Sequence, residues 1–387
     1  MDKYAFEIGR QKNLCLGELL AVLGEENLVE KNLDTAIFSL GDINTQDLQN
    51  SLGGTIKIVK IIDFIEKGQP KEIQIKNTIE DLLVETLTDA SGKIPFAIST
   101  LNFKNPRAIN IKELLNFSKK IIKSLGLNAR FVNKNFMPPP PSTIFKARIV
   151  EKGVDINLIS STEGLYVGKT VAIQNIDNYT ARDYDKPARD AKVGMLPPKL
   201  AQIMINLAGT DTKTIYDPFC GTGTISLEAM LMGKDTVGSD IEERLVEYSE
   251  RNLSWGKEYF DLHSNYNLFT KDARFITKND LPQNIDAVIT EGYLGPALSH
   301  FPDADEREKI FRELENLHLN WLSTIHKITP KNCKIVMCAT SFNDNGITIH
   351  MPHLEKVAQN AGYKVKEIFK YSRPDQIVVR DIVVLEK

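Results

Sequence analysis

Apolar and polar positions alternate along the chain with two different periods, and the switches between these periods predict the order of strands and helices. Three short alternating runs near the start are typical of strands: residues 4–8, 35–39 and 55–62. Helical spacing follows the first run over residues 14–23, and a second helix is expected to end near Leu52. This order predicts a small α+β domain over residues 1–66.

A second α+β domain is expected over residues 67–170. Helical spacing over 79–87 and 111–125 flanks a strand-like run at 96–100. Four consecutive prolines at 138–141 predict a rigid extended spacer. Two alternating runs after this spacer predict a hairpin that completes the domain: residues 143–150 and 154–159.

Strands and helices alternate regularly in the last part of the chain. Residues 171–193 are expected to form a polar, irregular linker, and residues 194–387 a doubly wound α/β domain. Seven strands are expected: residues 214–216, 236–240, 266–270, 285–290, 335–339, 363–369 and 376–385. Helices are expected over 225–232, 305–328 and 351–361. The last two strands are joined by so short a turn that they must be antiparallel.

A glycine-rich turn follows the first strand of this α/β domain and has the sequence Asp217-Pro-Phe-Cys-Gly-Thr-Gly-Thr224. Gly221 and Gly223 allow the backbone to approach a ligand closely, and free amides at the start of the next helix point into the same space. A Walker A loop is excluded because no lysine follows the second glycine. A dinucleotide is disfavoured because Asp217 would repel its pyrophosphate. A cationic ligand such as S-adenosylmethionine fits this turn better.

Acidic residues also end the next two strands, and they extend the candidate cofactor site. Asp240 ends the second strand, where a carboxylate can accept both ribose hydroxyls, and Asp272 follows the third strand. One such acid is usually a cap or a strand end, but three at successive strand ends indicate a binding site. The candidate cofactor residues are Asp217, Phe219, Cys220, Gly221, Thr222, Gly223, Thr224, Asp240, Ile241, Asp272 and Ala273.

From residue 194 onward, the segment Gly-Met-Leu-Pro-Pro-Lys-Leu-Ala201, the Asp217 turn and the strands that follow resemble the THUMP-containing tRNA guanosine methyltransferases. The resemblance is strong over about residues 190–387 and weaker over the first half. It implies a Rossmann-like methyltransferase domain behind a ferredoxin-like and THUMP RNA-binding region. It also implies S-adenosylmethionine as the cofactor, with the adenine amino group held near Asp272, and the exocyclic 2-amino group of a tRNA guanosine as the methyl acceptor.

The resemblance places the acceptor site at the end of the fourth strand, in Thr290-Glu-Gly-Tyr-Leu-Gly-Pro296. Amino-methylating relatives have Asp or Asn, Pro, Pro and an aromatic residue at this point. Here Glu291 replaces the shorter acid, and Gly292 and Tyr293 replace the two prolines. We expect Glu291 and the Gly292 carbonyl to accept hydrogen bonds from the amine, and the Tyr293 ring to stack on the base.

Charge is unevenly distributed, although the formal net charge is only −3. Residues 101–150 carry ten basic side chains and one acidic side chain, Glu113, whereas the regions on either side are acidic. Such an excess of one sign is typical of a surface that contacts a phosphate backbone. The candidate RNA-binding residues are Lys104, Arg107, Lys119, Lys120, Lys123, Arg130 and Lys134.

Several other classes of protein are disfavoured by composition. Four cysteines without a Cys-x-x-Cys pair and six histidines without metal spacing argue against a disulfide framework and a metal site. The first residues contain no long apolar run, so we expect a cytoplasmic protein with no membrane span. Two alternatives remain open: a DNA amino-methyltransferase, and a catalytically inactive RNA-binding module that keeps the cofactor fold. The oligomeric state is left open.

Overall fold

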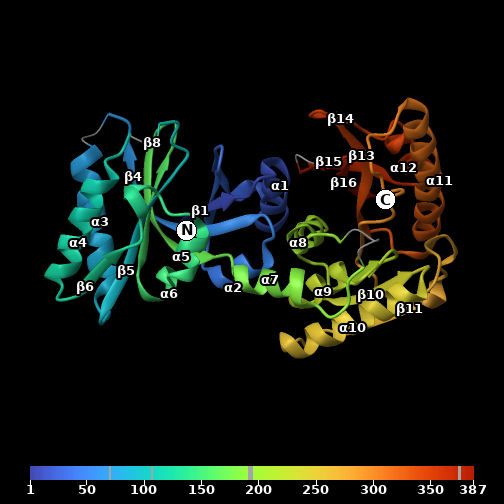
Figure 1. Cartoon of the computed structure of the whole chain (residues 1–387), viewed down its shortest axis with the longest axis horizontal. Coiled ribbons are helices and arrows are strands. Elements are labelled where there is room, and N and C mark those ends of the chain that lie inside the picture. The colour runs from blue at the N-terminus through green and yellow to red at the C-terminus, as the bar shows by residue number, and fades with distance from the viewer. Residues whose placement is uncertain (69–70, 106–107, 191–194, 374–375) are drawn as a thin grey trace. The chain divides into compact units, whose positions relative to one another are not determined.

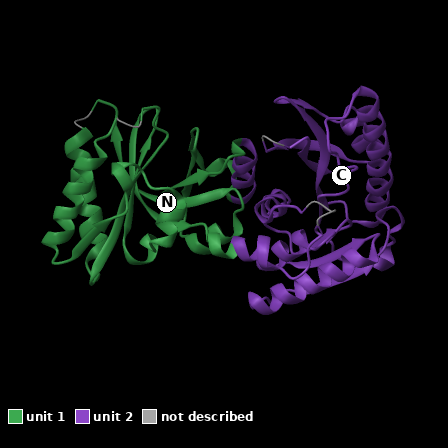
Figure 2. Cartoon of the chain, in the orientation of Figure 1, with its two compact units in different colours: residues 1–12, 23–178 green, residues 13–22, 179–387 purple. Residues whose placement is uncertain are grey.

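The chain forms two compact units, which Figure 2 colours separately. The computed structural model describes the following residues: 1–68, 71–105, 108–190, 195–373 and 376–387. Unit 1 contains Met1–Lys12 and Leu23–Asn178, and unit 2 contains Asn13–Val22 and Tyr179–Lys387. Most of α1 (Lys12–Leu23) therefore belongs to unit 2, although the sequence analysis placed this helix in the first domain.

Unit 1 is built on one eight-stranded sheet in the order β2-β3-β1-β4-β8-β7-β5-β6. Figure 1 labels β1, β4, β5, β6 and β8 of this sheet. Its strands are β1 (Asp2–Ile8), β2 (Leu28–Lys31), β3 (Thr35–Leu40), β4 (Thr55–Glu66), β5 (Lys93–Leu101), β6 (Asn128–Phe131), β7 (Val154–Ser160) and β8 (Gly164–Ile173). β4 pairs antiparallel with β8, from Lys57 opposite Ile173 to Glu66 opposite Gly164. The boundary expected between residues 66 and 67 therefore lies within one continuous sheet.

The helices of unit 1 cover this sheet with their apolar sides. They are η1 (Glu25–Asn27), α2 (Thr45–Ser51), α3 (Lys71–Leu87), α4 (Ile111–Ser124), η2 (Lys134–Phe136), α5 (Pro141–Lys146) and α6 (Ile149–Lys152). Leu83 of α3 and Leu115 of α4 are buried in one core with Phe96 of β5 and Leu158 of β7. The remaining face of α4 is exposed to solvent and carries the exposed lysines of this helix.

The prediction of a strand over residues 143–150, the first strand of the expected hairpin, is wrong. Residues 143–150 form α5 and part of α6 instead of a strand, and β7 pairs with β8 to make the hairpin. Pro141 occupies the first turn of α5, where its fixed φ suits a helix and its missing N–H costs nothing. The β-branched residues that suggested a strand are instead buried on helices: Ile144 and Ile149 pack in one core with Ala97 and Ile173.

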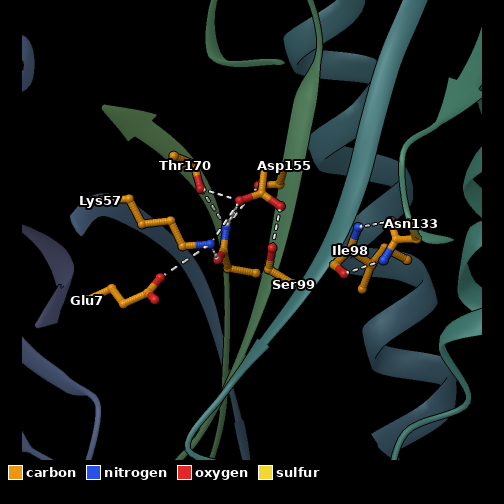
Figure 3. Close-up of polar contacts among 8 residues, drawn as sticks. Glu7, Lys57, Ile98, Ser99, Asn133, Asp155 and Thr170 are labelled. Carbon is orange, nitrogen blue, oxygen red and sulfur yellow. Dashed lines mark hydrogen bonds and ion pairs between the residues drawn. The ribbon is translucent and has the colours of Figure 1, made fainter. Parts of the chain in front are cut away.

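A buried polar network crosses the sheet of unit 1 (Figure 3). Lys57 of β4 is 2% exposed, and its Nζ lies 3.0 Å from Asp155 Oδ2 of β7 and 3.7 Å from Glu7 Oε2 of β1. Ser99 of β5 and Thr170 of β8 donate hydrogen bonds of 2.7 and 2.6 Å to the same Asp155 carboxylate. Because a buried charge is stable only when paired, this network fixes the register of the strands that it joins.

Unit 2 contains a doubly wound sheet in the order β11-β10-β9-β12-β13-β16-β15, with β14 added to β13. Its strands are β9 (Thr214–Asp217), β10 (Asp235–Asp240), β11 (Tyr266–Thr270), β12 (Ala287–Thr290), β13 (Lys334–Asp344), β14 (Ile347–Ile349), β15 (Lys364–Tyr371) and β16 (Val378–Glu386). The first five strands along this order are parallel, and β16 is antiparallel to both β13 and β15. The expected reversal at the last strand pair is confirmed.

Helices cover both faces of this sheet because its strands are apolar on both sides. The helical segments after α1 are α7 (Ile176–Thr180), a π-helical turn η3 (Ala181–Asp185), α8 (Pro198–Leu207), α9 (Thr224–Leu231), α10 (Glu243–Tyr259), η4 (Ala273–Phe275), η5 (Lys278–Asp280), α11 (Ala304–Ile328) and α12 (Leu354–Asn360). Val288 of β12 packs in the core with α11 and α12, whereas its neighbours Ala287 and Ile289 pack with α8 and α9.

Helix α1 belongs to the second of these cores. Leu14 is buried with the residues of α8, and Glu18 accepts a 2.7 Å hydrogen bond from Asn206. A Cβ on Gly17 would lie 2.5 Å from the ring of Phe369 on β15, so the helix approaches this strand closely. The architecture of unit 2 confirms the expected Rossmann-like α/β class. No helix in the described part of the chain is long and apolar enough to cross a bilayer.

Candidate functional site

The glycine-rich turn connects β9 to α9 and is held by hydrogen bonds to the neighbouring strand. Cys220 N donates to Ser239 O at 2.9 Å, and Gly221 N donates to Asp240 Oδ2 at 3.0 Å. Gly223 has φ 79° and precedes the first residue of α9. A Cβ at this position would also lie 3.0 Å from Ser249 Oγ, so both the conformation and the tight space favour glycine.

Part of the segment expected to be a linker supports this turn. Asn252 of α10 donates to Ala188 O at 2.9 Å and to Thr222 O at 2.8 Å, so it ties the segment to the turn. Lys186 is buried and donates to Thr224 Oγ1 at 3.1 Å. Residues 181–185 form a π-helical turn, so the expectation of an irregular linker is wrong for these residues. Polar side chains in this segment suggested an irregular linker, but Lys186 and Arg182 are buried against residues of α9.

A cavity of about 440 Å³ lies at the carboxyl ends of the parallel strands in unit 2. Ten of the eleven candidate cofactor residues line it: Asp217, Phe219, Cys220, Gly221, Thr222, Thr224, Asp240, Ile241, Asp272 and Ala273. Gly223 is not among the described lining residues; its positive φ shapes the turn before α9. The three candidate acceptor residues also line the cavity: Glu291, Gly292 and Tyr293. The structure therefore brings these two predicted sets together.

Sequence reasoning missed several residues that line the same cavity: Met195, Leu196, Glu242, Arg274, Leu317 and Arg380. Arg380 is the most informative of these because it lies in the apolar strand β16. A charged residue within such an apolar run could have been recognised in the sequence as a candidate functional residue. Among the described residues, the lining contains five carboxylates and two guanidinium groups, so it is suited to a cationic ligand. No group of His, Cys, Asp or Glu in the described residues is arranged to hold a metal ion.

Asp217 is a buried carboxylate without an opposing cation. Its side chain accepts a hydrogen bond of 3.1 Å from Phe219 N and another from Thr290. Burial is the main cause that raises its pKa to about 7, and the hydrogen bonds oppose this change. No ion pair to Asp217 is formed by any described residue. An ammonium group entering the cavity would therefore supply the missing charge.

The surroundings of Asp240 and Asp272 shift the pKa values of the two carboxyl groups in opposite directions. Both oxygens of Asp240 accept backbone amides, from Gly221 and Glu242 at 3.0 Å each, while burial raises its pKa. Asp272 lies 2.6 Å from Arg274 Nη2, and this hydrogen-bonded guanidinium lowers the pKa of Asp272. The two amides fix the orientation of the Asp240 carboxylate, whereas the Asp272 carboxylate is already bound to Arg274.

Glu291 begins the loop after β12 and is paired with Arg380. Arg380 Nε donates to Glu291 Oε1 at 2.6 Å, and the two side chains are 10% and 16% exposed. Gly292 has φ 69°, a value that proline cannot adopt, so this backbone differs from any that a Pro-Pro sequence could form. Tyr293 is 51% exposed at the cavity.

The basic window, residues 101–150, lies in unit 1, on and around α4. Lys104, Lys120, Lys123, Arg130 and Lys134 are exposed, and Lys119 is partly buried. Arg107 lies outside the described residues. None of the six described candidates forms an ion pair with another described residue. Glu113, the acid of this window, is paired with Lys76 of α3 at 2.5 Å, so the positive charge of the window stays unbalanced.

Two exposed or partly buried aromatic rings accompany these lysines. Lys112 Nζ lies 5.3 Å from the centre of the Phe136 ring, and Lys119 Nζ lies 5.9 Å from that of Phe131. Phe136 is 38% exposed and has φ 58°, an uncommon conformation for a bulky residue. The surface combines cations with a ring held toward solvent.

Comparison with known proteins shows that part of unit 2 is similar to methyltransferase domains. Residues 186–291 match the family described as the RMKL-like methyltransferase domain. This range contains the glycine-rich turn, the three acidic strand ends and Glu291. The whole chain also resembles the crystal structure of TrmN from Thermus thermophilus, with a TM-score of 0.56, 14% identity and coverage of 100% of this chain and 99% of that one. At this identity, the likeness establishes the fold.

Two archaeal relatives are named tRNA (guanine(10)-N2)-dimethyltransferase. The protein from Methanothermobacter thermautotrophicus is 37% identical over 129 residues, which cover 33% of this chain and 35% of the relative. The protein from Pyrococcus abyssi is 28% identical over 219 residues, which cover 55% of this chain and 63% of the relative. The chain thus matches between about a third and just under two thirds of these relatives.

Proposed function

We propose that this chain transfers a methyl group from S-adenosylmethionine to the exocyclic 2-amino group of a guanosine in tRNA. The observation that carries the proposal is the set of carboxylates that end four strands around one cavity, Asp217, Asp240, Asp272 and Glu291. The match of this region to a methyltransferase domain supports the reaction type. The names of the archaeal relatives support guanine in tRNA as the substrate class.

The residues of the cavity fit this cofactor. S-adenosylmethionine, when bound, supplies an electrophilic methyl group on a sulfonium. Asp217 would accept hydrogen bonds from the ammonium of its methionine part, and Asp240 would accept the ribose hydroxyls. Ala273 and the part of Asp272 that Arg274 leaves free would contact the adenine. The buried, unpaired charge of Asp217 is the structural reason to expect a cation rather than a pyrophosphate.

The acceptor guanosine would lie against the loop that begins at Glu291. The carboxylate of Glu291 and the carbonyl of Gly292 would accept the two N–H groups of the amine, which turns its lone pair toward the methyl group. The exposed ring of Tyr293 would stack on the base. Most of the remaining rate acceleration would come from holding the nitrogen and the methyl carbon in line.

The basic window of unit 1 would bind the phosphate backbone of the tRNA. The candidate cations described there have no acidic partner among the described residues, and Phe136 offers a ring on which an unpaired base could stack. Neutralising phosphates releases counterions, so this surface would make tRNA binding depend strongly on salt.

Nucleoside analysis of a tRNA pool tests the proposal. The full chain is incubated with the pool and labelled S-adenosylmethionine, and label is expected in guanosine methylated on its 2-amino group. Glu291→Ala should retain the binding of both ligands and lower turnover to a small, measurable residual rate, because it removes an interaction that strengthens in the transition state. Glu308→Ala, an exposed change on α11, is the matched control.

Other outcomes would contradict the proposal in distinct ways. In a parallel incubation with DNA, label in DNA bases with none in tRNA would favour the DNA amino-methyltransferase. Binding of both ligands without any transfer would favour the inactive RNA-binding module. Full turnover by Glu291→Ala would show that the amine is accepted elsewhere.

A further inference from the structure

Arg380 joins the last strand pair of unit 2 to the acceptor loop. It lies on β16, opposite Thr340 of β13 and Tyr371 of β15, and its side chain lines the cavity. Its Nε donates to Glu291 Oε1 at 2.6 Å. We propose that Arg380 is a positioning residue that fixes the Glu291 carboxylate so that its second oxygen accepts a hydrogen bond from the amine being methylated. This inference rests on the proposed function.

The acceptor loop needs such a contact because its sequence is intrinsically flexible. Gly292 and Gly295 have φ 69° and 97°, and the glutamate side chain has one more rotatable bond than an aspartate. Ordering these groups only when substrate binds would cost entropy in every catalytic cycle. A contact that orders them in advance removes that cost, as rigid prolines would.

Three contacts hold the loop in place of prolines. Gly292 N donates to Thr290 Oγ1 at 3.0 Å, and Thr340 Oγ1 donates to Leu294 O at 3.0 Å. The hydrogen bond of Arg380 to Glu291 is the third contact, and of these three it alone acts on the acceptor side chain itself. Two of the three therefore come from the strands β13 and β16.

Arg380 also keeps the acceptor charged. Glu291 is surrounded by Asp217 of β9, Cys338 of β13 and Arg380 of β16. Burial raises the pKa of Glu291, and the adjacent guanidinium opposes this rise. A protonated Glu291 would present a donor on one oxygen and accept an amine less well. Arg380 is bound to Oε1, which leaves Oε2 of Glu291 to meet a ligand.

The contact geometry explains why arginine suits this position. Arg380 donates through Nε, whose N–H has a fixed direction in the plane of the guanidinium, so this single hydrogen bond orients the carboxylate and the guanidinium also favours its charge. Lysine would supply the charge without the fixed direction, and glutamine would supply a neutral donor. These two substitutions therefore separate charge from orientation.

The test compares Arg380→Gln and Arg380→Lys in two backgrounds, wild type and Glu291→Ala. Rates of guanosine methylation are measured across pH, together with S-adenosylmethionine affinity and thermal melting to establish that each variant is folded. Arg312→Gln, on the exposed face of α11, controls for the removal of an arginine. In the wild-type background, Arg380→Gln should lower kcat about tenfold to hundredfold, as expected for a misplaced catalytic group.

Three further results are expected if Arg380 acts through Glu291. The acidic limb of the kcat profile should move to higher pH in Arg380→Gln, and Arg380→Lys should restore that limb but only part of kcat. In the Glu291→Ala background, Arg380→Gln should change kcat by less than about twofold, since coupled residues are not additive. An equal loss in both backgrounds, or an unchanged kcat and pH profile in Arg380→Gln, would overturn the inference while leaving the proposed function standing. A wild type that binds both ligands but methylates no guanosine would overturn both.

Discussion

Replacing Asp217 by asparagine should stabilise the protein at alkaline pH while removing most of its affinity for S-adenosylmethionine. Asp217 is 2% exposed, and burial raises its pKa from an ordinary 3.8 to about 7. The native state therefore binds this proton more tightly than the unfolded state does. The stabilisation that comes from protonated Asp217 is fully present below about pH 4, and it is lost as the pH rises through about 7.

The size of the effect follows from the difference between these two pKa values. One pKa unit corresponds to about 1.4 kcal/mol, so the ionised carboxylate costs about 4 kcal/mol of unfolding free energy at pH 8. Asparagine has nearly the same shape and keeps an oxygen that can accept from Phe219 N. The variant should thus gain up to about 4 kcal/mol at pH 8 and almost nothing at pH 4.

Denaturant unfolding at pH 4.5 and pH 8, with calorimetry of S-adenosylmethionine binding, measures both parts of the prediction. Other titrating groups are common to both proteins and cancel in the difference between variant and wild type. Wild-type affinity should fall about tenfold for each pH unit below 7, as Asp217 becomes protonated. Asp235→Asn, at the opposite end of β10, should leave affinity unchanged. A variant whose stability differs from wild type by the same amount at both pH values would refute the reasoning.

Three other predictions concern the rest of the chain. Asp155→Ala should destabilise unit 1 by about 3 to 5 kcal/mol in denaturant unfolding, because it removes the nearer of the two carboxylates that pair with buried Lys57 and leaves only Glu7 at 3.7 Å; a change below about 1 kcal/mol would contradict this. Changing Lys119, Lys120 and Lys123 together to glutamine should lower the salt dependence of log tRNA affinity by about 0.7 to 0.9 for each phosphate that the variant no longer neutralises, and an unchanged slope would place the RNA elsewhere. Gly292→Pro should abolish methyl transfer but spare cofactor binding, because φ 69° is closed to proline; Gly292→Ala, with a milder strain, should retain more activity in the same assay.

The lining of the cavity in unit 2 was largely predictable because most of its acidic residues lie at or just after strand ends. In a doubly wound sheet the carboxyl ends of parallel strands lie along one edge, so acids that end successive strands must meet there. Asp217, Asp240 and Glu291 were identified by position in the sequence, and all three line the cavity. Arg380 was missed because β16 runs antiparallel, and its start rather than its end reaches the same edge.

Errors arose where long-range packing overrode local pattern. Residues 143–150 have the alternation of a strand, yet Pro141 starts a helix and the buried partners of Ile144 make it stable. The 66/67 boundary was placed at the polar stretch over residues 66–71, but β4, which precedes this stretch, pairs with β8, which follows it in the chain. Helix α1 was assigned by its place in the sequence, while its apolar side packs against α8.

The sequence by itself determined the fold class of unit 2, the glycine-rich turn of the candidate cofactor site and the basic segment, because each of these depends on residues that are neighbours in the chain. Local periodicity sets strand and helix order, and glycine and acid positions within one turn set its conformation and charge. Tertiary structure alone decided that Lys57 meets Asp155, that Asn252 ties residue 188 to the turn, and that Arg380 meets Glu291. These pairs lie far apart in the chain, and only the alignment of strands and helices in three dimensions brings their charges and donors within bonding distance.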